Sequence, residues 1–233
     1  MKISDRLKKI ADFVGEGNIL ADIGTDHGYV PIYLVKNNII PSAFAMDVKA
    51  GPLERAAEHI EEYGLRDKIQ LRLSDGLKML NKNEAESILI AGMGGALTVQ
   101  ILRQGRDILD TAKELIVSPQ SEINLVREYL LSINYKIVRE EMIKDAGKYY
   151  VIMKWIKGNG DEIHKYSQCE LLYGRMLLIN KNKVLLEYLV NERNTYSKIL
   201  KSLQDINGEE IISRKKELNE KLSLIGEAMR FYD

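Results

Sequence analysis

Residues 19–29, ILADIGTDHGY, decide the fold that the sequence predicts. The run from Ile19 to Ile23 is apolar except for Asp22, which is typical of a buried strand, and a helix is expected to begin at Gly28. The glycines Gly24 and Gly28 lie between strand and helix, where the absence of a side chain lets a ligand approach the backbone. Such a strand, turn and helix open the first unit of a doubly wound α/β sheet.

Short apolar runs alternate with amphipathic segments as far as about residue 156. We predict strands at 19–23, 42–46, 69–73, 87–90 and 115–117, and helices at 28–35, 52–63, 96–109 and 123–131. Two more strand-like runs, 135–143 and 148–156, are joined by Asp145-Ala146-Gly147, which is a hairpin signal. The pattern predicts an α/β fold with a seven-stranded sheet, parallel except for an antiparallel pair at its end.

Beyond residue 157 the sequence predicts helices only. Apolar and a few polar residues recur at alternating steps of four and three, in two series that Asn207-Gly208 separates. The two series are Leu185, Leu189, Glu192, Tyr196, Ile199, Leu203 and Ile206, and then Leu218, Leu222, Ile225, Met229 and Tyr232. They predict an antiparallel helical hairpin with a heptad seam, and hence two domains, 1–157 and 158–233.

Composition excludes several classes of protein. The 233 residues carry 34 basic and 34 acidic side chains, so nucleic-acid binding would need a local basic patch rather than bulk charge. The single cysteine, Cys169, excludes a disulfide framework. His59 and His164 have no partners at a metal-ligand spacing, so no metal site is expected. No apolar run approaches the ~18 residues of a membrane span, and we predict a cytoplasmic protein without a membrane partner.

The glycine loop favours a particular kind of cofactor. Its spacing does not match the G-x-G-x-x-G pattern of dinucleotide binding, and Asp26 would be awkward beside a pyrophosphate. A cofactor with positive charge and no phosphate, such as S-adenosylmethionine, suits the loop better. The alternative is an ordinary strand-to-helix turn.

Three further segments place polar or flexible groups after successive strands. Asp47 ends the second strand, where a carboxylate can accept both hydroxyls of a ribose. Ser74-Asp75-Gly76 follows the third strand, where an acid can accept from an adenine amino group. Ala91-Gly92-Met93-Gly94-Gly95 follows the fourth and leaves open backbone near the methionine end of the cofactor. Open α/β sheets bind ligands at this edge, and the joint pattern is specific for a methyltransferase core.

Several of these motifs resemble one known family. ADIGTDHGYVPIYL (21–34), AMDVKAGPLERA (45–56), LSDGL (73–77), IAGMGG (90–95) and VSPQ (117–120) look like the motifs of the bacterial tRNA (adenine-N1)-methyltransferases that modify adenine 22 of tRNA. The similarity runs along the whole chain. It implies a Rossmann-like class I methyltransferase domain, a helical coiled-coil domain at the C-terminus, S-adenosyl-L-methionine as the donor and tRNA as the substrate.

The resemblance also implies which residues contact the cofactor. Carried over by motif, they are Asp22, Gly24, Thr25, Asp26, His27, Gly28, Asp47, Val48, Ser74, Asp75, Gly76, Ala91, Gly92, Met93 and Gly94. The sequence leaves the oligomeric state open, and a monomer is compatible with it.

The catalytic prediction follows from what the fourth strand lacks. The place of the Asn/Asp-Pro-Pro-aromatic loop of many amine methyltransferases is taken here by Ala91-Gly92-Met93-Gly94, which has no side-chain acceptor. Adenine N1 has a free lone pair and needs no prior deprotonation, so the enzyme needs position and negative potential rather than a strong base. Asp26 is the candidate for that potential, and His27 and Tyr29 could orient or stack on the base.

Alternatives stay open for most of these residues. Asp26 could only bind the cofactor or cap the helix, and Tyr29 could be helix core. Pro119 and Gln120 could line the base pocket or merely end the strand. The basic residues at 6, 8 and 9 and at 214–216 could be solvated or could grip phosphates. The whole chain could also methylate another substrate, or be a non-catalytic RNA-binding protein that retains the fold.

Overall fold

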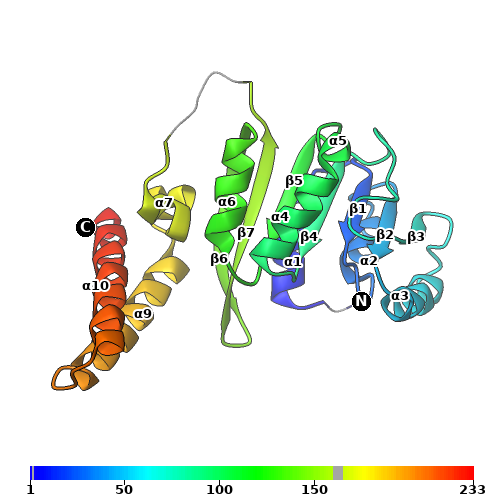
Figure 1. Ribbon diagram of the computed structural model, residues 1–233. Helices are drawn as coiled ribbons and strands as arrows, with labels where there is room; N and C mark the ends of the chain where they lie inside the picture. Colours follow the sequence, from blue (N-terminus) through cyan, green and yellow to red (C-terminus); the bar gives the residue numbers. More distant parts are fainter. Residues whose placement is uncertain (2, 160–164) are drawn as a thin grey trace. The chain divides into compact units, whose positions relative to one another are not determined.

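The computed structural model of the chain describes residue 1, residues 3–159 and residues 165–233. The chain divides into two compact units, residues 1–163 and residues 164–233. The first is built around a sheet and the second consists of helices (Figure 1). His164, which the sequence analysis considered as a metal ligand, lies outside the described residues.

The first unit contains one seven-stranded sheet with the order β3-β2-β1-β4-β5-β7-β6. The strands are β1 (Leu20–Ile23), β2 (Ala43–Asp47), β3 (Ile69–Leu73), β4 (Ser87–Ala91), β5 (Glu114–Ser118), β6 (Tyr135–Asp145) and β7 (Lys148–Lys157). Strands β1 to β5 pair in parallel, and β7 is inserted antiparallel between β5 and β6. The predicted sheet and its antiparallel end are confirmed. Strand β1 is buried along its whole length, which is expected when helices cover both faces of a parallel sheet.

The helices of this unit are α1 (Asp5–Ala11), α2 (Tyr29–Lys36), α3 (Ala50–Glu62), α4 (Gly95–Gln104), α5 (Arg106–Leu109) and α6 (Ile123–Ser132). Helices α1 and α2 contact each other, as do α4 and α6, which run side by side in Figure 1. The single helix predicted over 96–109 is wrong, because the chain breaks between α4 and α5 at Gly105. A Cβ atom there would lie 2.5 Å from Leu77 Cβ, so the break sits where the backbone passes very close to a neighbouring loop.

The antiparallel hairpin turns at two residues. Ala146 and Gly147 both have positive φ, 47° and 79°, as a tight two-residue turn between twisted strands requires. Asp145 and Lys148 pair across the turn. The hairpin signal read from the sequence is therefore confirmed, with longer strands than predicted on both sides of it.

Strand order places the ligand-binding edge of the sheet. Chain direction along the sheet reverses between β1 and β4, which are direct neighbours. The loop after β1, residues 24–28, and the loop after β4, residues 92–94, therefore leave the same edge next to each other. In open α/β sheets this reversal point is where ligands bind.

The second unit contains α7 (Gln168–Tyr173), α8 (Arg175–Ile179), α9 (Lys183–Ser202), α10 (Glu209–Met229) and a 3₁₀ turn (Arg230–Tyr232). Helices α9 and α10 form the predicted hairpin, and they lie side by side in Figure 1. Helices α7 and α8 were not predicted. They pack against α10 and the 3₁₀ turn, so the hairpin is covered at that end.

The predicted seam is correct at one end of the hairpin only. Leu185, Leu189, Leu218 and Ile225 are buried. Helix α9 ends at Ser202, however, so Leu203 and Ile206 lie beyond it, and Ile206 is 48% exposed. The seam opens there because two helices without a third layer cannot enclose a core.

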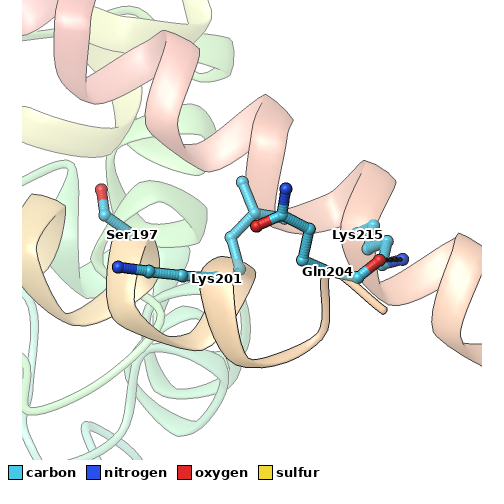
Figure 2. A pocket seen from close by; sticks show the side chains of 5 residues that line it. Ser197, Lys201, Gln204 and Lys215 are labelled. Atoms are coloured by element: carbon cyan, nitrogen blue, oxygen red, sulfur yellow. Dashed lines mark hydrogen bonds between the residues drawn. The ribbon is translucent and has the colours of Figure 1, made fainter. Parts of the chain in front are cut away.

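A shallow pocket lies near the turn between α9 and α10, where the seam is exposed. Figure 2 shows its lining side chains, and those labelled are Ser197, Lys201, Gln204 and Lys215. The Lys215 ammonium donates to the backbone oxygens of Gln204 and Ile206, each at 3.0 Å, and so closes the turn between the helices. No helix in the described part of the chain is long and apolar enough to cross a membrane.

Candidate functional site

A cavity of about 350 Å³ opens at the reversal point of the sheet. It is lined by residues of α1, of the loop after β1, of α2 and of the ends of β4 and β5: Arg6, Leu7, Asp22, Gly24, Thr25, Asp26, His27, Tyr29, Val30, Leu89, Ala91, Gly92 and Gln120. The structure thus brings most of the predicted residues of the first loop together with the start of the glycine loop after β4.

Asp22 is the buried acid of this cavity. It lies in β1, is 5% exposed, and accepts a hydrogen bond from the Thr25 hydroxyl at 2.7 Å. Burial raises the pKa of Asp22 to about 7, the hydrogen bond from Thr25 opposes that rise, and the charge of Asp47 adds to it. Among the described residues this carboxylate has one hydroxyl partner and no cation, so its charge is incompletely compensated. A ligand with an ammonium group would supply the missing charge.

Backbone geometry shapes the loop that follows Asp22. The N–H groups of Gly24 and Thr25 both donate to the Met46 oxygen, at 2.8 and 3.0 Å. Gly24 has a φ of 75°, and a Cβ on it would collide with the Met93 side chain, which packs against it. Gly28, also left-handed, caps α2 without any side-chain hydrogen bond. The suggestion that Asp26 caps this helix is therefore wrong.

Asp26 projects from the loop in the left-handed conformation, with a φ of 51°. Its side chain is 61% exposed and forms an ion pair with Arg55 at 2.9 Å, while His27 Nε2 lies 3.6 Å from its other oxygen. Arg55 therefore neutralises part of the negative charge of Asp26 that the sequence predicts to act at the target base. Asp26 lines the cavity and Arg55 does not, so the cavity meets a carboxylate that is already paired with a guanidinium outside its lining.

Three aromatic rings stack beside this pair. The His27 and Tyr29 rings lie 5.1 Å apart and are nearly parallel, and the Tyr29 and His59 rings lie 5.2 Å apart. The His59 Nδ1 atom is 3.0 Å from the His27 backbone oxygen. Tyr29 is 37% exposed, so the possibility that it is helix core is wrong.

His59 and Arg55 are site residues that sequence reasoning missed. The sequence gives His59 no partner at a metal-ligand spacing and assigns no role to Arg55. Both lie on α3, four residues apart and so on one helix face, and both reach the loop after β1. The spacing was visible in the sequence, but its meaning depends on where α3 packs.

A second group of predicted residues lies at the ends of β2 and β3 and does not line the cavity. The Ser74 N–H donates to the backbone oxygen of Asp47 at 2.8 Å, and this hydrogen bond holds the two strand ends together. Asp47 accepts from the Lys49 N–H, and Asp75 pairs with Lys78. Ser74 is buried and donates to the Gly76 oxygen, so its hydroxyl shapes the turn. Val48 is 59% exposed beside them.

The glycine loop after β4 is fixed to the end of β5. The Gly92 N–H donates to the Ser118 oxygen at 3.1 Å, and the Gln120 N–H donates to the Met93 oxygen at 2.8 Å. Ala91 and Gly92 line the cavity, whereas Met93 and Gly94 do not. Of the two residues after β5, Gln120 lines the cavity and Pro119 is buried outside it.

The basic residues of α1 differ in their surroundings. Lys8 and Lys9 pair with Asp5 and Glu141, at 3.8 and 3.1 Å. The Arg6 guanidinium instead lies over the Tyr150 ring at 4.9 Å and lines the cavity. In the second unit, Arg214 pairs with Glu217 and Lys215 closes a turn, so Lys216 is the residue of that run for which the described contacts show no partner.

The described residues contain neither a cluster that could bind a metal ion nor a reactive thiol. No three side chains of His, Cys, Asp or Glu gather there in a way that could hold a metal ion. Cys169 is buried in the second unit, and its burial raises the pKa of the thiol to about 12. Cys169 therefore fills space in the core of the second unit.

Comparisons with known proteins agree on one family. Residues 3–153 match the family model described as a methyltransferase domain. The chain is 33% identical to the tRNA (adenine(22)-N(1))-methyltransferase of Bacillus subtilis, over 98% of each protein. The crystal structure of Streptococcus pneumoniae Sp1610 with S-adenosyl-L-methionine is 32% identical, with a TM-score of 0.87, and covers 98% of this chain and 100% of that one. The structure of M. capricolum TrmK with S-adenosyl-homocysteine is 28% identical, with a TM-score of 0.85, and covers 99% of each chain.

Proposed function

The chain belongs to the tRNA (adenine(22)-N(1))-methyltransferase family, and we propose that the cavity at the reversal point of its sheet is where methyl transfer takes place. As a member of that family it is an S-adenosylmethionine-dependent enzyme that methylates N1 of adenine 22 in tRNA. This function replaces the two alternatives that the sequence left open, another substrate and a non-catalytic protein. A tRNA substrate also favours the cytoplasm as its place of action, and a monomer is sufficient for it.

The residues present fit the cofactor. The buried Asp22 carboxylate has no cation beside it within residues 3–159 and 165–233, and it would accept from the ammonium group of S-adenosylmethionine. The open backbone at Gly92 leaves room for its methionine part. The second group, at the ends of β2 and β3, supplies Asp47 for the ribose hydroxyls and Asp75 for the adenine amino group.

Chemistry at the target needs little from the protein beyond position and charge. Bound S-adenosylmethionine supplies an electrophilic methyl group, and its transfer to the N1 lone pair leaves a positively charged base. Asp26 stabilises that developing charge more than the neutral starting base, to the extent that Arg55 leaves its charge free. Tyr29, in its stack with His27, presents a ring face at the cavity wall for the base. No general base is required, since N1 carries no proton.

The second unit is proposed to bind tRNA. Lys201 in its pocket and Lys216 on α10 are cations that can contact phosphates, and neither has an ion-pair partner among the described contacts (Figure 2). We expect Lys201→Glu to weaken tRNA binding several-fold with cofactor affinity unchanged. Equal tRNA affinity in variant and wild type, measured at two salt concentrations, would remove this pocket from the tRNA surface.

The observation that carries the proposal is the buried Asp22 in the lining of the cavity, whose charge no described cation compensates. The test is incubation with methyl-labelled S-adenosylmethionine and unmodified tRNA, followed by digestion and nucleoside analysis. Label should appear in 1-methyladenosine with wild-type tRNA and be absent when guanine replaces adenine 22. Label that persists in the guanine-substituted tRNA would assign the activity to another position.

A further inference from the structure

Gln120 is a polar residue of the cavity to which the mechanism above gives no task. It is the second residue after β5, and its backbone N–H donates to the Met93 backbone oxygen at 2.8 Å. Its side-chain nitrogen, Nε2, lies 3.8 Å from the place that a Cβ on Gly92 would occupy. The amide group is therefore held beside the glycine loop after β4, across the sheet edge from Asp26 and Tyr29, which come from the loop after β1.

Gln120 carries the one side-chain amide among the residues that line the cavity. His27 also has an unpaired polar atom among the described residues, its buried ring nitrogen Nδ1, but a ring nitrogen does not offer a donor and an acceptor together. Thr25 donates to Asp22, Asp26 is paired with Arg55, and Arg6 lies over Tyr150. The side-chain amide of Gln120 makes no hydrogen bond within the described part of the chain, and the residue is exposed to the cavity. It offers a donor and an acceptor side by side in one plane.

Adenine has two edges that match such an amide, and only one is compatible with methylation at N1. On the Watson–Crick edge the amide would donate to N1 itself and occupy the lone pair that must react. On the Hoogsteen edge, Oε1 accepts from the N6 amino group and Nε2 donates to N7, which is the familiar glutamine–adenine pair. That pairing leaves N1 free and turned away from Gln120.

We propose that Gln120 selects the target base by pairing with the N6 and N7 atoms of the adenine. The inference rests on the proposed function of the cavity and names the residue that reads the substrate there. Guanine presents an acceptor, O6, in place of the N6 amino group, so Oε1 of Gln120 would face another acceptor. Gln120 is thus a specificity-determining residue that takes no part in bond making.

The test is a double-mutant cycle that combines one substitution in the protein with the replacement of one atom, N7, in the substrate. Wild type and Gln120→Ala are each assayed with tRNA carrying adenosine or 7-deazaadenosine at position 22, which lacks N7 and keeps N1 and N6. For wild type we expect the 7-deaza substrate to lower kcat/KM about 10-fold, the lower part of the range for a bidentate base contact. For Gln120→Ala, already lower by about 10- to 100-fold, the same change in the substrate should have no further effect.

Gln100→Ala provides the matched control, because Gln100 is exposed on α4 and does not line the cavity. It should respond to 7-deazaadenosine as wild type does. Cofactor affinity, measured by calorimetry without tRNA, should stay within about twofold in Gln120→Ala.

Three outcomes would overturn the proposal. These are an equal loss from 7-deazaadenosine in wild type and Gln120→Ala, no loss in wild type, or a cofactor affinity that falls with activity in Gln120→Ala. The last result would make Gln120 a cofactor ligand. Failure of the proposed function is a different result, since wild type would then not methylate the unmodified tRNA at all.

Discussion

Two buried acids of the same sheet have opposite surroundings. Glu114 begins β5 and is 7% exposed, and Asp22 lies in β1 and is 5% exposed. Glu114 pairs with Lys154 at 2.5 Å and accepts from the Gly15 N–H and the Ser87 hydroxyl, at 2.6 and 2.7 Å. In the described part of the chain Asp22 has the Thr25 hydroxyl and no cation.

The difference separates an acid that holds the fold together from one that is kept for a ligand. Burying a carboxylate costs free energy unless charge and hydrogen bonds compensate it, and Glu114 receives both from the protein. Asp22 does not, and burial raises its pKa to about 7 as a result. The sheet therefore carries uncompensated charge at its ligand-binding edge and none at Glu114.

Removal of Glu114 should have the largest effect, and on stability. Glu114→Ala leaves the Lys154 ammonium, which is 20% exposed, without its partner, and it also leaves the Gly15 N–H and the Ser87 hydroxyl without their acceptor. Breaking a buried pair from one side costs about 3–5 kcal/mol. Urea unfolding should show this loss in the free energy of unfolding. Asp107→Ala, which breaks the exposed pair with Lys82, should cost less than about 1 kcal/mol, and similar costs in both variants would erase the contrast.

Asp22→Asn should mainly lower the affinity for the cofactor, whereas Glu114→Ala mainly lowers stability. A hydrogen bond to a charged group contributes about 1.5–3 kcal/mol, so S-adenosylmethionine should bind roughly 10- to 100-fold more weakly at pH 8. In the wild type a bound cation favours the ionised form of Asp22, so binding releases a proton below pH 7. Affinity should therefore fall as pH drops below about 7, by up to about tenfold per unit. Calorimetry between pH 5.5 and 8.5 measures both effects.

The same substitution should not destabilise the fold. The pKa of Asp22 in the folded protein is raised above its usual value, so the wild type loses stability as pH rises from about 4 through 7. Asp22→Asn has no such loss, and its free energy of unfolding at pH 8 should equal or exceed that of wild type. If Asp22→Asn unfolds as easily as Glu114→Ala, Asp22 is a structural acid and the comparison fails.

Of the two acids, the sequence predicts the role of Asp22 but not that of Glu114. Asp22, Asp47 and Asp75 stand at or near the ends of successive apolar runs, and topology brings such ends to one edge. Strand β3 begins and ends at the predicted residues, Ile69 and Leu73. The role of Glu114 depends on Lys154, which lies 40 positions further along and reaches it only because β7 is inserted beside β5.

Other features that the sequence does not predict also depend on contacts between distant parts of the chain. The break at Gly105 depends on Leu77 from a distant loop, and Arg55 and His59 matter because of where their helix packs. Local periodicity predicts an element and its buried face but not the neighbour that the element will meet. The site could therefore be located at a sheet edge from the sequence, while its ion pair and its ring stack could not.

A third acid, Asp26, shows what exposure does to such a charge. Its side chain is 61% exposed and paired with Arg55, so solvent and the guanidinium screen it. We expect Asp26→Asn to lower the single-turnover rate at saturating cofactor about 10-fold, less than the ~10²-fold typical for loss of a preorganised electrostatic group. The affinity for tRNA should barely change. Arg55→Gln keeps the carboxylate and should retain the wild-type rate or exceed it; a loss equal to that of Asp26→Asn would mean that the pair positions the loop instead.

The smallest effect should come from Thr25→Val, which keeps the shape of the side chain and removes the hydroxyl that donates to Asp22. That hydrogen bond favours the ionised carboxylate, so its loss should raise the pKa of Asp22 further above 7. The pH at which cofactor affinity begins to fall should move upward by less than about one unit, which at pH 7 is a several-fold weaker affinity. Thr25→Ser keeps the hydroxyl and should follow the wild-type profile.

The backbone groups of Thr25 form hydrogen bonds with Met46 and Gly28 in every variant, so the geometry of the loop should be the same in all of them. A profile that stays in place in Thr25→Val would assign the pH dependence to another group of the cavity, and Asp22 would lose its distinction from Glu114.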